Sequence, residues 1–258
     1  MVSVTNEDKI RQYYEVLRRA WGPQHWWPAE TSFEVIVGAY LTQNTAWTNV
    51  ERALANLRAA GTLNLQGVRK IRLRRLQKLI RPSGYFRQKA KRIKAFVAFL
   101  DRNYHGSLDK LFRQPTEKLR KELLGLNGVG PETADSILLY AGNHPVFVVD
   151  AYTRRILARH ELLPEKTDYE DIRQLFQSAL SPTADGVRST PPWPAEFDTS
   201  KPRGAAHAPS AMSTADRAPL AQVYNEMHGL IVGVGKNHCG KSQPNCDACP
   251  LRQFLPGV

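Results

Sequence analysis

The sequence predicts an all-α fold, and two observations carry this prediction. Apolar residues recur at helical spacing along most of the chain, beginning with Ile10, Tyr13, Tyr14 and Leu17. The only run that resembles a strand, residues 146 to 149, is too short to build a sheet. Packed layers of helices are therefore the architecture that can bury these apolar faces.

The first helices are predicted from their caps and their apolar faces. Asn6 can cap the first helix, because Glu7 and Asp8 then lie in its first turn, near its positive end. A second helix is predicted from Thr31 through Thr42, and a third near residues 48 to 57.

Two later helices are predicted in the same way. Ile93, Phe96, Val97 and Leu100 make the apolar face of one helix. The opposite face is expected to carry basic residues, which are Lys89, Lys91, Arg92 and Lys94. Thr167 with Glu170 forms the pattern of a capping box before a further helix.

Residues 181 to 217 interrupt the helical pattern. This stretch is rich in Pro, Ser, Thr, Ala and Gly, which bury little apolar surface. We expect a flexible insertion or linker there, with the helical pattern returning near Leu220.

The charge balance favours a polyanionic partner. The chain has 258 residues with 36 Lys and Arg against 24 Asp and Glu, a formal net charge of +12. Its pI is about 9.8, which is typical of proteins that bind nucleic acid. An ordinary basic enzyme would also fit. Neither a secretion signal nor a membrane-spanning run is visible, so we expect no membrane partner and a cytoplasmic location.

A glycine-rich turn is the most informative local pattern. The chain reads Gly128-Val129-Gly130-Pro131, and proline suits the first position of a new helix. Two glycines allow a tight turn whose N–H groups can bind a phosphate at the helix start. Gly128, Val129 and Gly130 are therefore candidate phosphate-binding residues; a glycine-capped turn between two helices is the alternative.

Asp150 follows the turn after an apolar helix and a short extended run. It could simply cap the next helix. The order of hairpin, helix, extended run and Asp, however, resembles the endonuclease III-like helix-hairpin-helix DNA glycosylases. The resemblance implies that Asp150 faces the lesion pocket. There its charge would stabilise the oxocarbenium-like sugar as the damaged base leaves.

Glu132 bears on the reaction type. Family members that also nick the DNA strand carry a lysine two residues after the last glycine of the hairpin, and its amine forms a Schiff base with the sugar. A carboxylate cannot form this imine. The resemblance therefore implies a monofunctional glycosylase that uses water, while Glu132 also suits the first turn of its helix.

Aromatic residues bear on the substrate. Trp26 and Trp27 could stack on a flipped base, although a tryptophan pair is also an ordinary core anchor. Together with Pro28, Glu132 and the run from Leu41 to Thr45, they resemble the 3-methyladenine DNA glycosylases of this superfamily. The resemblance implies an alkylated purine as the base removed.

Gln43 and Asn44 are candidates for filling the gap that the flipped base leaves in the DNA. In the family this position lies at a loop or helix end, and an amide can bond to the orphaned partner base. A simple polar pair on a helix is the alternative.

Three cysteines lie near the C-terminal end. Cys239, Cys246 and Cys249 match the first three ligands of the family's iron–sulfur loop, but Leu255 stands where the fourth is expected. A [4Fe–4S] cluster with another ligand, zinc bound with the help of His238, or no metal are all open. None of these is required for the hydrolysis.

The resemblance implies two helical lobes with a DNA cleft between them. Residues 31–124 would form a helical barrel, and residues 1–30 with 125–258 the hairpin and cysteine-loop domain. We expect a monomeric base-excision glycosylase acting on damaged double-stranded DNA, associated with the nucleoid if bacterial. The alternatives are a glycosylase for oxidised pyrimidines with lyase activity, and a non-enzymatic DNA-binding protein.

Overall fold

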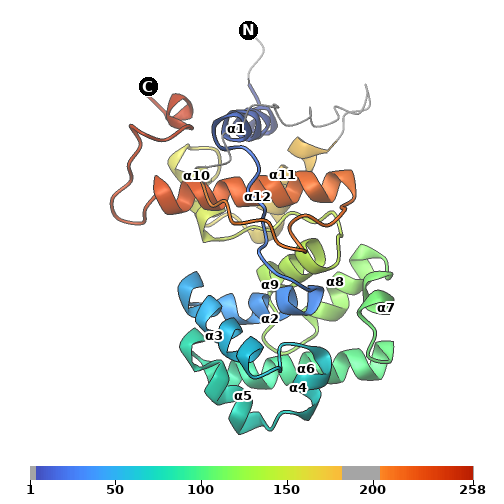
Figure 1. Ribbon diagram of the computed structural model, residues 1–258. Coiled ribbons are helices and arrows are strands. Elements are labelled where there is room, and N and C mark those ends of the chain that lie inside the picture. The colour runs from blue at the N-terminus through green and yellow to red at the C-terminus, as the bar shows by residue number, and fades with distance from the viewer. Residues whose placement is uncertain (1–3, 182–203, 258) are drawn as a thin grey trace. The chain divides into compact units, whose positions relative to one another are not determined.

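The computed structural model describes residues 4–181 and 204–257 and confirms the all-α fold (Figure 1). No strand occurs within these two ranges. None of the helices described there is long and apolar enough to cross a membrane. The chain divides into two compact units, here called the central unit (residues 29–144) and the terminal unit (residues 1–28 with 145–258).

The boundary between the units differs from the one expected at residue 124. The hairpin and the helix after it belong to the central unit, because α9 and η2 pack against α2 and α8. The helices of this unit are α2 (Ser32–Thr42), α3 (Trp47–Ala59), α4 (Leu65–Lys70), α5 (Leu73–Leu79), η1 (Arg81–Ser83), α6 (Phe86–Tyr104), α7 (Leu108–Phe112), α8 (Thr116–Leu124), α9 (Pro131–Ser136) and its π-helical continuation η2 (Ile137–Ala141).

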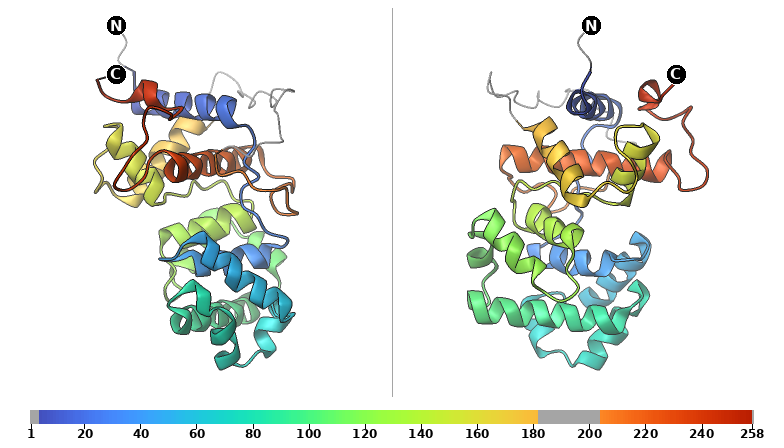
Figure 2. Two further views of the ribbon diagram at one scale, coloured as in Figure 1. Left: turned by 60° about the vertical axis from the view of Figure 1, so that its left-hand side comes forward. Right: turned by 180° about the vertical axis from the view of Figure 1, so that it is seen from behind.

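Helix α2 forms the core of the central unit. Every residue from Phe33 to Leu41 is buried, and a helix that is apolar on all sides must be covered on all sides. It packs against α3, α6, α9 and η2. The long helix α6 in turn carries α4, α5 and α7 along its length (Figure 2). The loop after α2 and the hairpin are thus attached to the same core.

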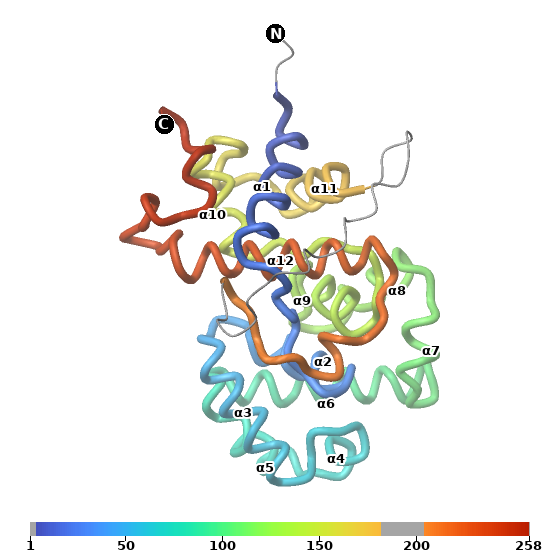
Figure 3. Tube along the Cα trace, turned by 45° about the horizontal axis from the view of Figure 1, so that its top comes forward, coloured from blue at the N-terminus to red at the C-terminus, as the bar shows by residue number. Residues whose placement is uncertain are grey.

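The terminal unit is built around α12 (Pro219–Asn237). This helix packs against α1 (Asn6–Trp21), α10 (Ala151–Arg159) and α11 (Tyr169–Leu180) (Figure 3). A short helix, η3 (Arg252–Phe254), follows the cysteine loop. Three polar residues in the middle of α12 are buried, namely Asn225, Glu226 and His228.

The first cap lies one residue earlier than expected. Thr5, not Asn6, is the N-cap of α1, because its hydroxyl accepts the N–H of Asp8 and the Asp8 carboxylate accepts the N–H of Thr5. Asn6 instead donates its side-chain amide to the carbonyl of Leu162, 3.0 Å away.

The capping box predicted for α11 is also wrong. Asp168 is the N-cap of this helix and makes no side-chain cap bond. The hydroxyl of Thr167 donates to the carbonyl of Pro164 in the preceding turn. The carboxylate of Glu170 accepts a hydrogen bond from Nε of Arg173, one turn later in the helix, at 2.8 Å. Local hydrogen bonds of the turn therefore replace the box.

The segment predicted to be a flexible insertion is only partly within the described residues. Residues 182–203 lie outside them. Residues 204–217 pack on the loop after α1, since the N–H of Ala205 donates to Oε1 of Gln24 at 2.8 Å and the N–H of His207 donates to its carbonyl at 3.1 Å. Within residues 204–217, a partner far away in the sequence thus supplies hydrogen bonds to residues 205 and 207.

Candidate active site

A tight turn joins α8 to α9 and forms the predicted hairpin. Gly128 has a φ of +76°, in the left-handed region that favours glycine. A Cβ there would also lie 1.9 Å from Nε of Arg92, so a larger residue would displace this arginine. Gly130 is the N-cap of α9 and Pro131 begins the helix, as predicted. A Cβ on Gly130 would meet no atom within 4 Å, so the backbone here is open to a ligand.

A buried ion pair braces the hairpin from behind. Arg120 of α8 donates from Nε and Nη2 to the two carboxylate oxygens of Asp135 of α9, at 2.7 and 3.0 Å. The pairing is bidentate, which fixes the angle between two planar groups. Within the turn, the N–H of Val129 donates to the carbonyl of Leu126 at 3.0 Å. The two helices therefore hold the three hairpin residues in one conformation.

Gln43 connects the loop after α2 to the hairpin. Its Nε2 donates to the carbonyl of Gly128 at 3.0 Å and to Oγ1 of Thr133 at 2.9 Å. Nη1 of Arg92 donates to its Oε1 at 2.8 Å. Both ends of the Gln43 amide are thus bonded within the central unit. The next residue, Asn44, is exposed and has a φ of +52°.

Lys89 does not lie on the basic face of α6, where the sequence places it. Its Nζ is buried and donates to the carbonyls of Leu41 at 2.8 Å and Ser83 at 2.6 Å. Burial, with a smaller effect of the nearby Arg92 charge, lowers the pKa of Lys89 to about 8. The prediction was wrong because Lys89 is four residues before Ile93 and shares its apolar face.

Asp150 is the N-cap of α10 in the terminal unit. Its Oδ1 accepts the N–H of Thr153 at 2.8 Å and the hydroxyl of Thr153 at 2.9 Å. Its Oδ2 lies 3.7 Å from Nε2 of His228 on α12. The side chain is 12% exposed, so the carboxylate reaches the surface while its orientation is fixed from inside. A cap for the helix and an available anion are both compatible with this geometry.

His228 also links Asp150 to the tryptophan pair. The rings of Trp26 and His228 lie 6.0 Å apart, and Trp27 packs edge-on against Trp26 at 5.7 Å. The structure thus brings Trp26 and Asp150, which are far apart in the sequence, to the same histidine. Sequence reasoning missed His228; the available signal was a lone imidazole within the apolar run of α12.

Further side chains complete the surroundings of Trp26. The ring of His207 lies 5.5 Å from the Trp26 ring, and Nζ of Lys236 lies 5.7 Å from it. A protonated amine over an indole face is a cation–π arrangement. Each of these residues belongs to the terminal unit.

Glu226 holds the loop that carries Trp26. Its Oε2 accepts the backbone N–H of Gln24 at 3.0 Å. Burial raises the pKa of Glu226 to about 7, and the bond from Gln24 partly opposes this rise. The loop is therefore attached to α12 at Gln24, two residues before Trp26.

Glu132 is the second residue of α9 and is exposed. It belongs to the central unit with the hairpin, whereas Asp150 and Trp26 belong to the terminal unit. An acid in the first turn suits the positive end of the helix.

The cysteine loop follows α12 and is tied to α10 by two arginines. Nε of Arg155 donates to the carbonyl of Cys239 at 2.7 Å. Nη1 of Arg159 lies 3.1 Å from Sγ of Cys239 and 2.7 Å from the carbonyl of Gly240. Arg159 thus donates a hydrogen bond to this sulfur.

The donor set does not fit the family's four-thiolate cluster. Leu255 occupies the fourth position, and no group of three or more His, Cys, Asp or Glu residues in the described ranges converges as a metal site. Burial raises the pKa of the Cys249 thiol, and a backbone hydrogen bond from Leu251 partly opposes the rise. His238, the candidate zinc ligand, stacks on Trp21 with ring centroids 5.8 Å apart.

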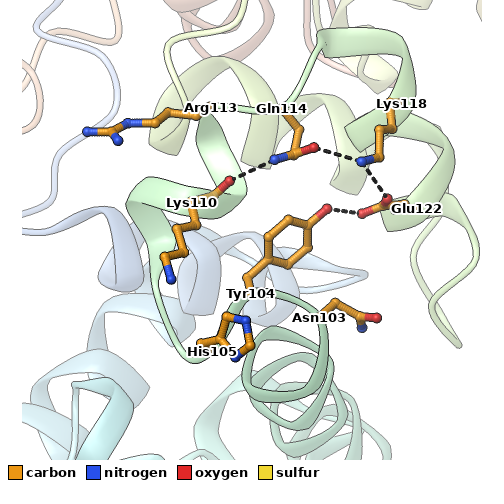
Figure 4. A pocket seen from close by; sticks show the side chains of 8 residues that line it. All are labelled: Asn103, Tyr104, His105, Lys110, Arg113, Gln114, Lys118 and Glu122. Atoms are coloured by element: carbon orange, nitrogen blue, oxygen red, sulfur yellow. Dashed lines mark hydrogen bonds and ion pairs between the residues drawn. The ribbon is translucent and has the colours of Figure 1, made fainter.

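A polar cavity of about 540 Å³ lies between α6, α7 and α8 of the central unit (Figure 4). None of the predicted site residues lines it. Its side chains bond to one another, since Tyr104 donates to Glu122, and Lys118 donates to Gln114 at 2.7 Å. Apart from the rings of Tyr104 and His105 the lining consists of charged and amide side chains, so it lacks the predominantly apolar surface of a pocket for a base. We do not assign the lesion to this cavity.

Comparison with known proteins agrees with this arrangement. Residues 37–182 match the model of the HhH-GPD superfamily of base excision DNA repair proteins. A protein of Methanocaldococcus jannaschii, whose name provisionally assigns it as a DNA repair glycosylase, is 38% identical over 96% of both chains.

Two solved structures extend the comparison. The 3-methyladenine DNA glycosylase of H. pylori, bound to 1,N6-ethenoadenine, is 28% identical with a TM-score of 0.67, over 89% of this chain and 96% of that one. A trapped endonuclease III–DNA covalent intermediate has the same fold, at 18% identity and a TM-score of 0.71, over 99% and 97% of the two chains. On this evidence the chain belongs to the HhH-GPD superfamily of base excision DNA repair proteins, and is a DNA glycosylase.

Proposed function

We propose that this glycosylase hydrolyses the N-glycosidic bond of an alkylated purine such as 3-methyladenine, without nicking the strand. It would act as a monomer on duplex DNA that contains the damaged base. The observation that carries the proposal is the placement of Asp150, an anion at the surface whose orientation is fixed by Thr153 and which lies beside His228 and Trp26.

Asp150 supplies the charge that the reaction needs. As the base leaves, positive charge develops on the sugar, and a preoriented carboxylate stabilises it without reorganising. Because Thr153 occupies Oδ1, we assign the interaction with the sugar or with the attacking water to Oδ2.

The choice of an alkylated purine rests on two kinds of support. The H. pylori relative is a 3-methyladenine glycosylase, and it is more similar in sequence to this chain than endonuclease III is. Trp26 and Trp27 are buried, at 6% and 5% exposure, and Lys236 already lies over the Trp26 ring, so the choice of substrate does not depend on stacking against their faces. An alkylated purine also has a weakened glycosidic bond, so a single carboxylate is sufficient.

The absence of strand nicking rests on Glu132. A carboxylate at this position cannot form a Schiff base with the sugar. Lys89, whose pKa is lowered, is buried and bonded to two carbonyls, so it does not replace the missing lysine.

The central unit supplies the contacts to DNA in this proposal. Gly128, Val129 and Gly130 would bind a phosphate through the backbone at the start of α9. Of the two amide candidates, we assign the gap-filling role to Asn44, since the amide of Gln43 is already bonded to Gly128, Thr133 and Arg92.

Base release from defined duplexes tests the proposal. The expected result is release of 3-methyladenine from alkylated DNA, with little release from thymine glycol or uracil duplexes. Asp150→Asn should lower the single-turnover rate by about 100-fold or more, by analogy with the loss of one charge-stabilising group. The variant should fold, because asparagine is also a good N-cap. Asp168→Asn, at the exposed N-cap of α11, is the matched control and should leave the rate unchanged.

Borohydride trapping tests the absence of lyase chemistry. A covalent adduct between the protein and damaged DNA would contradict the monofunctional mechanism. Release of thymine glycol in preference to 3-methyladenine would contradict the substrate class, and release of no base at all would contradict the function.

A further inference from the structure

His228 is a buried imidazole that faces the proposed catalytic carboxylate. Its ring lies in the core of the terminal unit, 6.0 Å from the ring of Trp26 and 6.3 Å from the ring of Phe147. From this apolar setting its Nε2 points to Oδ2 of Asp150 at 3.7 Å. Oδ2 is the oxygen that Thr153 leaves available.

We propose that His228 is a positioning residue for the glycosylase reaction: it holds Oδ2 of Asp150 toward the sugar and fixes Trp26 beside it. This inference rests on the proposed function, because it assigns His228 a role through Asp150. It goes beyond that function by naming a second residue on which the rate depends.

The placement of His228 argues against a role in packing alone. Burying a polar group costs free energy unless it finds a partner, and a leucine in this position of α12 would pack without that cost. The ring is turned so that a nitrogen faces the carboxylate. Since α12 supplies the histidine and the start of α10 supplies Asp150, the contact also connects two helices that pack together.

The charge state of His228 suits this role. Burial lowers the pKa of His228, and the charge of Asp150 opposes the shift only in part. The imidazole is therefore neutral near pH 7 and can offer an N–H to the carboxylate. A cation there would oppose the positive charge that develops on the sugar, whereas a neutral donor orients the anion without cancelling it.

Other ionisable groups near Trp26 are directed elsewhere. Glu226, on the same helix, accepts the N–H of Gln24. His207 and Lys236 lie against the ring of Trp26. Asp150 is thus the charged group that the described contacts place against His228.

Two substitutions of His228 separate positioning from packing. His228→Leu keeps an apolar volume and removes the donor, whereas His228→Gln keeps an N–H. At 3.7 Å the contact between Nε2 of His228 and Oδ2 of Asp150 is longer than a normal hydrogen bond, so we take the lower end of the range of about 1.5–3 kcal/mol for bonds to a charged group and expect His228→Leu to lower the single-turnover rate by about 10-fold. We expect His228→Gln to restore most of the rate, and both variants to bind damaged duplex as the parent protein does.

His160→Leu is the matched control. His160 is a buried histidine of the same unit, bonded to the hydroxyl of Tyr13 at 2.8 Å and not in contact with Asp150. Its loss should lower the melting temperature without a specific loss of rate. Equal loss of rate in His160→Leu and His228→Leu, measured where both are folded, would overturn the inference.

A double variant makes the test independent of stability. If His228 acts through Asp150, the double variant Asp150→Asn with His228→Leu should react only slightly more slowly than Asp150→Asn alone. The losses of rate from the two substitutions are then not additive. Additive losses, or no rescue by glutamine, would overturn the inference while leaving the proposed function intact. If Asp150→Asn itself releases base at the parent rate, the proposed function fails first.

Discussion

The buried lysine of α6 makes the stability of the protein depend on pH in a specific way. The pKa of Lys89 is about 8 in the folded protein against an ordinary value of 10.5. Between these values the unfolded chain binds a proton that the folded chain does not, so the free energy of unfolding rises with pH. Below pH 8 both states carry the proton, and the contribution no longer changes. From the two pKa values, the gain between pH 7 and pH 9.5 is about 2 kcal/mol.

Lys89→Met is the perturbation that isolates this effect. At pH 7 the variant loses two hydrogen bonds from a charged donor, each worth about 1.5–3 kcal/mol. The variant also lacks the buried ammonium charge. The lowered pKa of Lys89 implies that this charge destabilises the folded state by about 3 kcal/mol. The two bonds together are worth about 3–6 kcal/mol against a charge cost of about 3 kcal/mol, so the net change at pH 7 ranges from about zero to about 3 kcal/mol and the absolute stability there is a poor readout. The difference between the two proteins should instead grow by about 2 kcal/mol in favour of the parent from pH 7 to pH 9.5.

Urea unfolding followed by circular dichroism at pH 7 and pH 9.5 measures this difference. Lys91→Met, which changes an exposed lysine of the same helix, is the matched control and should follow the parent at both values. Parallel pH dependence of the parent and Lys89→Met would refute the reasoning, because it would mean that Lys89 keeps an ordinary pKa in the folded state.

The remaining predictions concern the hairpin and its contacts. Gly128→Ala should lower stability by more than about 1 kcal/mol, since its φ is positive and a Cβ would meet Arg92; thermal melting measures this. The Cβ of Gly130→Ala would meet no atom, so this variant should melt at the same temperature as the parent. Weaker binding of duplex DNA by the variant would place the phosphate contact at Gly130. Unchanged binding would count against a phosphate contact there. Gln43→Leu removes three hydrogen bonds and should destabilise the central unit by about 1–3 kcal/mol; an unchanged urea midpoint would argue against this. Glu132→Lys restores an amine beside the hairpin, and we expect a borohydride-trappable adduct that the parent lacks.

Much of the fold could be predicted from local patterns. The periodicity of apolar residues indicates helices without a sheet, and Gly128, Gly130 and Pro131 mark the hairpin because their backbone preferences are local. Asp150 as a helix cap follows from the residue type and its position before an apolar helix.

Other features could not be predicted because their partners are distant in the sequence. Lysine is usually found at the protein surface. Lys89 is buried because the carbonyls of Leu41 and Ser83 accept hydrogen bonds from its Nζ and offset the cost of removing it from water. The backbone of Ala205 and His207 is bonded to Gln24, which lies some 180 positions away. The unit boundary follows from helix packing, which no local pattern encodes.

The sequence by itself determined the class of fold, the hairpin, the candidate aspartate and the absence of a lysine at position 132. These are properties of residue types and short spacings. Only the tertiary structure decided that Gln43 is bonded within the central unit and that Arg159 lies against the sulfur of Cys239. Only the tertiary structure also brought His228 between Trp26 and Asp150. The physical reason is that a contact between helices depends on how their faces pack, and packing joins residues whose separation along the chain carries no local signal.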